Sequence, residues 1–215
     1  MPALTLARFL SRRGLVATVL GCSAVLAVSA CTPGTVRQQP KRLLLAYQGA
    51  LPQTPATPLP RLVLRAVSVP DYLDRRELVR RVGAVEVARD EGAVWAERPS
   101  KAITRWVTLA LGAQRSDYAV ESYTTADGRA PDALLAITLE GFEPGADGTL
   151  RLRGSWVFAP NGQRASLSGR FDADAPTRSG SAEASVAALE QALDNAVKKL
   201  ARQLPAAAAK TDTRP

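Results

Sequence analysis

LRLRGSWVF at residues 150–158 and ASLSGRF at residues 165–171 are the two stretches that decide the fold. In both, bulky apolar residues alternate with Arg or Ser, which is the two-residue period of a β-strand with one buried face. Asn161-Gly162 lies between them and is the sequence preferred by two-residue hairpin turns. The pair therefore predicts an antiparallel hairpin with one apolar face and one polar, Arg-rich face that meets water or a partner.

Apolar runs bounded by turn residues predict more strands before this hairpin. The expected strands lie at residues 42–48, 61–69, 78–81, 85–89, 118–123 and 135–139. The last two should continue into the hairpin as an antiparallel meander. The third and fourth should form a hairpin around Gly83, and Asp90-Glu91-Gly92 predicts the next turn.

Two segments have the three- and four-residue apolar spacing of amphipathic helices. The first begins at Pro99 or Ser100 and ends at Gly112, a suitable C-terminal cap. The second covers residues 181–204. We therefore expect an α+β fold: a single domain whose mostly antiparallel sheet carries both helices on its one apolar face.

Residues 1–30 are organised as a lipoprotein signal peptide. Three arginines precede an apolar run that Gly and Ala dilute too much for a permanent membrane span, and Val28-Ser29-Ala30-Cys31 forms a lipobox. Cleavage before Cys31 would make its thiol the lipidation site. Cys22 is the rival site, although the apolar run before it is short. Ser11-Arg12-Arg13 leaves twin-arginine export open beside the ordinary route.

The remaining chain divides into three parts. Residues 31–40 are a Pro- and Gln-containing tether with almost nothing apolar, residues 41–204 form the folded domain, and residues 205–215 are expected to be a disordered tail. Thr32, rather than Asp, follows Cys31. Under the enterobacterial sorting rule this favours the periplasmic face of the outer membrane.

Composition excludes several classes of function. The formal net charge of +8 falls to +5 without the three arginines of residues 1–30, and the remaining arginines are scattered, so nucleic-acid binding is not indicated. The chain has no histidine and no cysteine besides Cys22 and Cys31. Ser–His–Asp catalysis, Cys–His catalysis and the usual zinc sites are therefore excluded. We expect no catalytic residues, no cofactor and no metal site.

Residues 70–111 carry the most specific pattern in the chain. Its segments are PDYLDR at 70–75, LVRR at 78–81, VEV at 85–87, WAE at 95–97 and AITR at 102–105. In spacing and sequence they resemble the PqiC-type family of ABC-transport auxiliary lipoproteins, over most of residues 41–204. The resemblance implies an outer-membrane lipoprotein that acts with an MCE-domain protein and an inner-membrane component to move lipid or maintain the envelope.

The turn within this pattern is the expected partner surface, because it mixes both signs of charge with apolar side chains. Its residues are Asp71, Tyr72, Leu73, Arg75 and Leu78. The partner would be the transport apparatus or a second copy of the chain. A solvated loop is the alternative.

Other chemistry-bearing residues have structural explanations. Trp95 could cap a groove or a subunit contact, but buried aromatics are the commoner outcome for both Trp95 and Trp106. Acidic residues are common in turns for local reasons. That explanation is preferred to carboxylate catalysis or metal binding for Asp71, Asp74, Asp90, Glu91 and the motif Asp172-Ala173-Asp174.

These features favour a non-catalytic subunit of an MCE/ABC-type intermembrane lipid transport or envelope-integrity system. The alternative is a free-standing envelope lipoprotein that binds a lipid, lipopolysaccharide or glycan, or assists outer-membrane assembly. A carboxylate-dependent envelope hydrolase is the least favoured reading.

Overall fold

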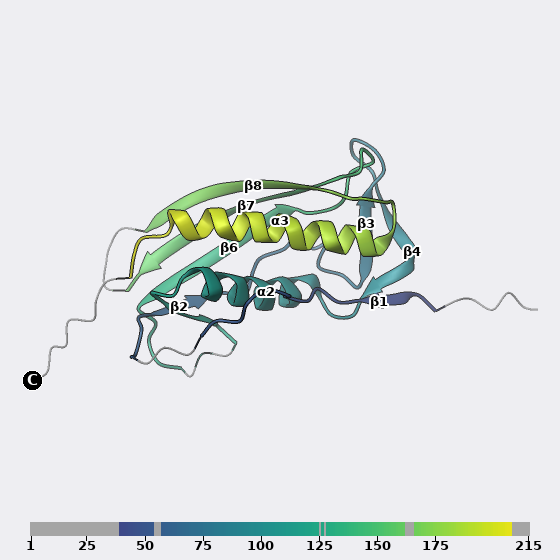
Figure 1. The fold of residues 1–215 in the computed structure, drawn as a ribbon. Coiled ribbons are helices and arrows are strands. Elements are labelled where there is room, and N and C mark those ends of the chain that lie inside the picture. Colours follow the sequence, from purple (N-terminus) through teal and green to yellow (C-terminus); the bar gives the residue numbers. More distant parts are fainter. Residues whose placement is uncertain (1–38, 54–56, 125, 127, 162–165, 208–215) are drawn as a thin grey trace, which may run out of the picture. The chain divides into compact units, whose positions relative to one another are not determined.

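The structure is a computed structural model that describes residues 39–53, 57–124, 126, 128–161 and 166–207 (Figure 1). The predicted signal peptide, the lipobox with Cys31, most of the tether, Gly162 of the hairpin turn and residues 208–215 lie outside the described residues. In the part of the chain that the structure describes, two helices and eight strands in two sheets make the expected α+β fold.

The larger sheet contains five strands. In spatial order they are β5 (Ala119–Ser122), β2 (Arg61–Leu64), β6 (Ala133–Gly141), β7 (Thr149–Pro160) and β8 (Leu167–Pro176). The expected pairing of the fifth and sixth strands is wrong, because β2 inserts between them and runs parallel to both. All four residues of β2 are buried, as in a strand covered on both faces. The sheet is therefore mixed, with only β6, β7 and β8 antiparallel.

The hairpin of β7 and β8 is confirmed, with Leu150 opposite Ala175 and Phe158 opposite Leu167. On its inner face, aromatic rings cover glycines across the two strands. A Cβ atom on Gly154 would lie 2.6 Å from the ring of Phe171 opposite it. Aromatic side chains that lie over cross-strand glycines fill the gap these glycines leave in a sheet.

The smaller sheet contains β1 (Lys41–Leu43), β4 (Val87–Trp95) and β3 (Glu77–Arg81) in that order. The first predicted strand is shorter than expected and ends at Leu43. Strands β3 and β4 form the expected hairpin, but Asp90-Glu91-Gly92 does not turn the chain. These residues lie in a bulge, where the register jumps from Arg89 opposite Val79 to Val94 opposite Glu77.

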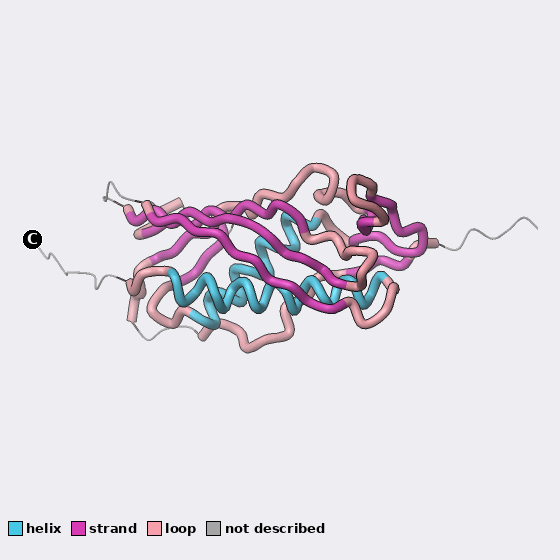
Figure 2. Tube along the Cα trace, turned by 90° about the horizontal axis from the view of Figure 1, so that it is seen from above, coloured by secondary structure: helices cyan, strands magenta, loops and turns pink. Residues whose placement is uncertain are grey.

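Helices α2 (Pro99–Gln114) and α3 (Ala182–Gln203) cover one face of the larger sheet, and the smaller sheet lies at one end of it (Figures 1 and 2). The Ser181 side chain accepts a 3.1 Å hydrogen bond from Ala184 N and caps α3. Gly112 is not the cap of α2, because the helix continues to Gln114. A Cβ atom at Gly112 would lie 2.8 Å from Pro52, so the glycine allows close packing instead.

The C-terminal end of α3 is held by side chains from the segment after α2. Ala207 N donates to Asp117, and Pro205 O accepts from Arg115. Residues 205–207 of the expected tail are therefore bound to the folded core. Within the described residues, no helix is long and apolar enough to cross a membrane.

Candidate functional site

The predicted partner surface divides into exposed and buried residues. Asp71, Tyr72 and Arg75 are exposed on the turn, whereas Leu73 and Leu78 are buried. Leu73 and Leu78 instead line a groove behind the turn. The charged side of this segment therefore faces water, and its apolar side forms one wall of the groove.

Glu143 ties this turn to the neighbouring elements. Tyr72 Oη donates a 3.1 Å hydrogen bond to Glu143, and the Arg81 guanidinium of β3 forms an ion pair with the same carboxylate. Burial, and then the charge of Glu143, raise the pKa of Tyr72 to about 12, so its hydroxyl remains a donor at neutral pH. Arg81 N also donates to Pro144 O at 2.9 Å. The turn, β3 and the β6–β7 loop are thus fixed to one another.

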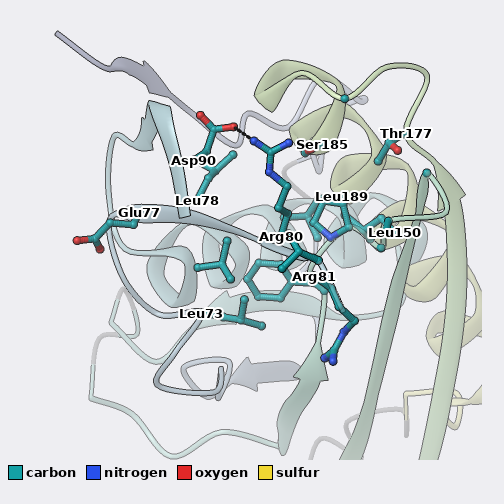
Figure 3. Close-up of a pocket in the computed structure, with 18 of the residues that line it drawn as sticks. Leu73, Glu77, Leu78, Arg80, Arg81, Asp90, Leu150, Thr177, Ser185 and Leu189 are labelled. Atoms are coloured by element: carbon teal, nitrogen blue, oxygen red, sulfur yellow. Dashed lines mark hydrogen bonds and ion pairs between the residues drawn. The ribbon is translucent and has the colours of Figure 1, made fainter. Parts of the chain in front are cut away.

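The groove lies between the smaller sheet, the β6–β7 loop and the start of α3 (Figure 3). Its volume is ≈ 540 Å³, within the range of about 300–1,000 Å³ typical of small-molecule sites. The largest apolar side chains that line it come from separate parts of the chain. They belong to Leu73, Leu78, Trp95, Phe142, Leu150 and Leu189. Trp95 therefore satisfies both sequence interpretations, since it is buried and also lines a groove.

Polar groups also line the groove. Arg80 of β3 donates to Asp90 of β4 at 3.3 Å, and Thr177 and Ser185 line the same groove (Figure 3). Ser179, between β8 and α3, is also part of the lining. Bulky apolar side chains together with a few polar groups can hold an amphiphilic molecule.

The acidic residues of the turns have local partners. Asp74 accepts from both Ser100 N at 2.9 Å and Ser100 Oγ at 3.0 Å, and so caps the start of α2. Asp90 accepts from Gly92 N as well as from Arg80. No group of three or more His, Cys, Asp or Glu side chains that could hold a metal occurs within the described ranges.

Turn chemistry is the wrong explanation for Asp172-Ala173-Asp174, because these residues lie inside β8. Both aspartates are exposed, and their strand neighbours on β7 are arginines. Asp172 pairs with Arg153 at 3.3 Å, and Asp174 is opposite Arg151. This is a cross-strand charge ladder on the polar face of the sheet.

The first described residues are held against α3 and the smaller sheet. Lys41 pairs with Glu183 at 2.8 Å, β1 pairs in parallel with β4, and Ala46 N donates to Glu190 at 3.2 Å. Tyr47 then meets Trp106 edge-on, with ring centroids 5.3 Å apart. Trp106 is therefore a core aromatic, and the chain enters the domain beside the first turn of α3.

Arg115 is a structural residue that the sequence did not single out. It is buried, pairs with Asp117 at 2.7 Å, and donates to the carbonyl oxygens of Ala201, Leu204 and Pro205. An arginine after a helix carries no local signal that it will cap a second helix nearly ninety residues later.

Comparison with known proteins identifies the family. The sequence model described as "ABC-type transport auxiliary lipoprotein component" matches residues 43–201. The chain belongs to this family. Membership makes it an auxiliary lipoprotein of ABC-type transport, a class whose description names no catalytic activity. No curated protein matches the chain significantly.

Solved structures share the fold of this lipoprotein domain. The crystal structure of an uncharacterized protein has a TM-score of 0.64 at 20% identity, covering 78% of this chain and 100% of that one. The crystal structure of protein XCC0632 from Xanthomonas campestris, of the family DUF330, has a TM-score of 0.56 at 20% identity, covering 75% and 90%. At this identity the likeness concerns the fold.

Proposed function

We propose that the chain is a non-catalytic subunit of an MCE/ABC-type intermembrane lipid transport or envelope-integrity system, anchored in the outer membrane through lipidated Cys31. The observation that carries the proposal is the family match over residues 43–201, preceded in the same chain by the lipobox at Val28-Ser29-Ala30-Cys31. Two or three acyl chains on a cysteine anchor a protein stably, where one would be marginal.

In this proposal the domain has a positioning role: it is held at the membrane, where it can meet its partner. The lipid fixes one end, and the segment from Lys41 to Tyr47 holds the tether against α3 and the smaller sheet through the contacts described above. The domain then receives a bridge built from an MCE-domain protein and an inner-membrane component. The exposed residues Asp71, Tyr72 and Arg75 are the proposed contact with that partner or with a second copy of the chain.

Affinity purification of the full-length lipoprotein from detergent-solubilised envelopes tests the partner assignment. Enrichment of an MCE-domain protein or its membrane partner by mass spectrometry is the expected result. Arg75→Glu should reduce this enrichment, whereas Arg202→Glu, a matched charge reversal at an exposed position of α3, should not. A preparation that contains the lipoprotein alone, or with lipid only, would contradict the transport assignment.

Anchoring is tested separately. Cys31→Ser should move the protein out of the membrane fraction and abolish its function without unfolding the domain, whereas Cys22→Ser should leave it in the outer-membrane fraction. A soluble Cys31→Ser variant with full activity would contradict the proposed mechanism.

The groove favours a second candidate, a free-standing envelope lipoprotein that binds a lipid. A reproducible lipid in the purified protein, without enrichment of any transport component, would distinguish it from the first.

A further inference from the structure

The groove has the chemistry of a site for one hydrocarbon chain. Its six bulky apolar side chains come from the turn, the smaller sheet, the β6–β7 loop, β7 and α3, so no single element determines it. The walls are joined by Arg81 N to Pro144 O and by Thr177 N to Gly148 O, at 2.9 and 2.8 Å. These bonds fix the walls of the groove relative to one another, so the groove is largely preformed.

Arg80 gives the groove lining a half-exposed cation that can meet a negatively charged head group. The Arg80 side chain is 48% exposed, and its bond to Asp90 engages Nη2 at 3.3 Å. A guanidinium has five donors, so it can bind a phosphate oxygen while it remains beside Asp90. Figure 3 shows the Arg80–Asp90 pair, and Ser185 and Thr177 also line the groove.

The groove also lies beside the point where the tether enters the domain. Lys41 pairs with Glu183, two residues before Ser185 in α3. Lys41 lies ten positions after Cys31, and ten extended residues reach at most about 36 Å. This step rests on the proposed anchoring through Cys31, which would keep the groove within that reach of the bilayer, whereas the chemistry of the groove does not depend on it.

We infer that the groove binds a single acyl chain of a glycerophospholipid, with the chain along Leu73, Leu78, Phe142 and Leu189 and the phosphate at Arg80. The inference goes beyond the transport assignment, since it concerns what this chain itself binds. A domain that holds one lipid beside its own membrane anchor can receive lipid from a partner or release it to the membrane.

Binding is measured with the Cys31→Ser chain in detergent-free buffer, so that the anchor does not compete. The probes are lysophosphatidylglycerols with 10, 12 and 14 carbons, each below its critical micelle concentration, titrated by calorimetry. At about 0.8 kcal/mol per buried CH₂, each two-carbon step should strengthen binding about fifteenfold. Saturation at one lipid per chain is expected. Binding that is absent, or that does not change with chain length, overturns the inference.

Site-directed variants place the lipid in the groove. Ser185→Phe should fill the groove and weaken binding at least tenfold, whereas Ala187→Phe, at an exposed position of the same helix, should not change it. Arg80→Gln should weaken the binding of lysophosphatidylglycerol about two- to fivefold, as expected for a half-exposed charge pair. It should leave the binding of an alkyl maltoside of equal chain length unchanged. Equal binding by the Ser185→Phe and Ala187→Phe variants overturns the inference.

Fluorescence gives an independent readout that does not require a blocked groove. A lysophosphatidylglycerol with a brominated chain should quench Trp95, which lines the groove, and Trp95→Phe should remove most of the quenching. Quenching that is unchanged by Trp95→Phe places the lipid elsewhere and overturns the inference. A failure of lipid binding leaves the transport assignment standing, because the purification from envelopes tests that assignment independently.

Discussion

Replacing Arg115 with methionine should lower the free energy of unfolding more than a typical surface substitution. The side chain is 9% exposed and makes five hydrogen bonds, two to Asp117 and three to the carbonyl oxygens of Ala201, Leu204 and Pro205. Methionine preserves much of the apolar stem but none of the donors.

The magnitude follows from the exposure of the partners. Removing one member of a buried ion pair costs about 3–5 kcal/mol. The side chain of Asp117 is 38% exposed and can return to water, so we expect the lower end, about 3 kcal/mol. For a domain of this size that corresponds to a fall in Tm of about 6–12 °C. Urea unfolding of the Cys31→Ser chain, with and without Arg115→Met, measures the difference.

The pH dependence provides the internal check. The hydrogen bond from Arg115 holds the pKa of Asp117 at about 2, below the value of about 3.9 for an unfolded aspartate. A lowered carboxyl pKa stabilises the fold above the unfolded pKa, and that contribution is lost as the pH falls from about 4 toward about 2. The cost of Arg115→Met should therefore shrink across this window.

Arg202→Met, at an exposed position in the last turn of α3, serves as the control and should change stability by less than about 0.5 kcal/mol. Asp117→Asn should cost less in the Arg115→Met background than alone, as a double-mutant cycle of a contacting pair requires. A cost below about 1 kcal/mol at neutral pH, or one that does not shrink in acid, would refute this reasoning.

Three further substitutions test the packing, by urea unfolding of the same chain. Gly154→Ala should cost about 1–3 kcal/mol, because its Cβ atom would lie 2.5 Å from a backbone oxygen and 2.6 Å from Phe171. Asp74→Ala should lower the free energy of unfolding by about 0.5–2 kcal/mol, because it removes the carboxylate that accepts from Ser100 N and caps the start of α2. Glu190→Gln should stabilise the protein at pH 7 but not at pH 3. Burial raises the pKa of Glu190, so its ionised form destabilises the fold as the pH rises past the unfolded value.

The first two substitutions have matched controls in the chain. Gly180→Ala should be nearly neutral, since a Cβ atom there meets nothing within 4 Å, and a cost equal to that of Gly154→Ala would contradict the close-packing argument. Asp71→Ala, on the same turn as Asp74, should change stability by less than about 0.5 kcal/mol. Glutamine retains an oxygen that can accept from Ala46 N, so destabilisation by Glu190→Gln at neutral pH would contradict the argument from the buried charge.

The candidate site was only partly predictable. The pattern of residues 70–81 identified a segment of interest, because this short stretch mixes charged and apolar side chains. Trp95 was considered separately as a residue that could cap a groove. The apolar residues Phe142, Leu150 and Leu189 carry no such signal. Each has the local pattern of an ordinary core residue, and their convergence depends on how the β6–β7 loop and α3 meet the smaller sheet.

The amino-acid sequence by itself determined which segments are strands and helices wherever the apolar period was clear, as in β7, β8 and α3. It also determined the absence of histidine chemistry and the family pattern. Only the tertiary structure decided that β2 lies between β5 and β6, that Asp90-Glu91-Gly92 forms a bulge, and that Arg115 caps α3. The physical reason is that periodicity reports which face of a segment is buried, whereas the identity of the neighbour across that face depends on contacts between residues far apart in the chain.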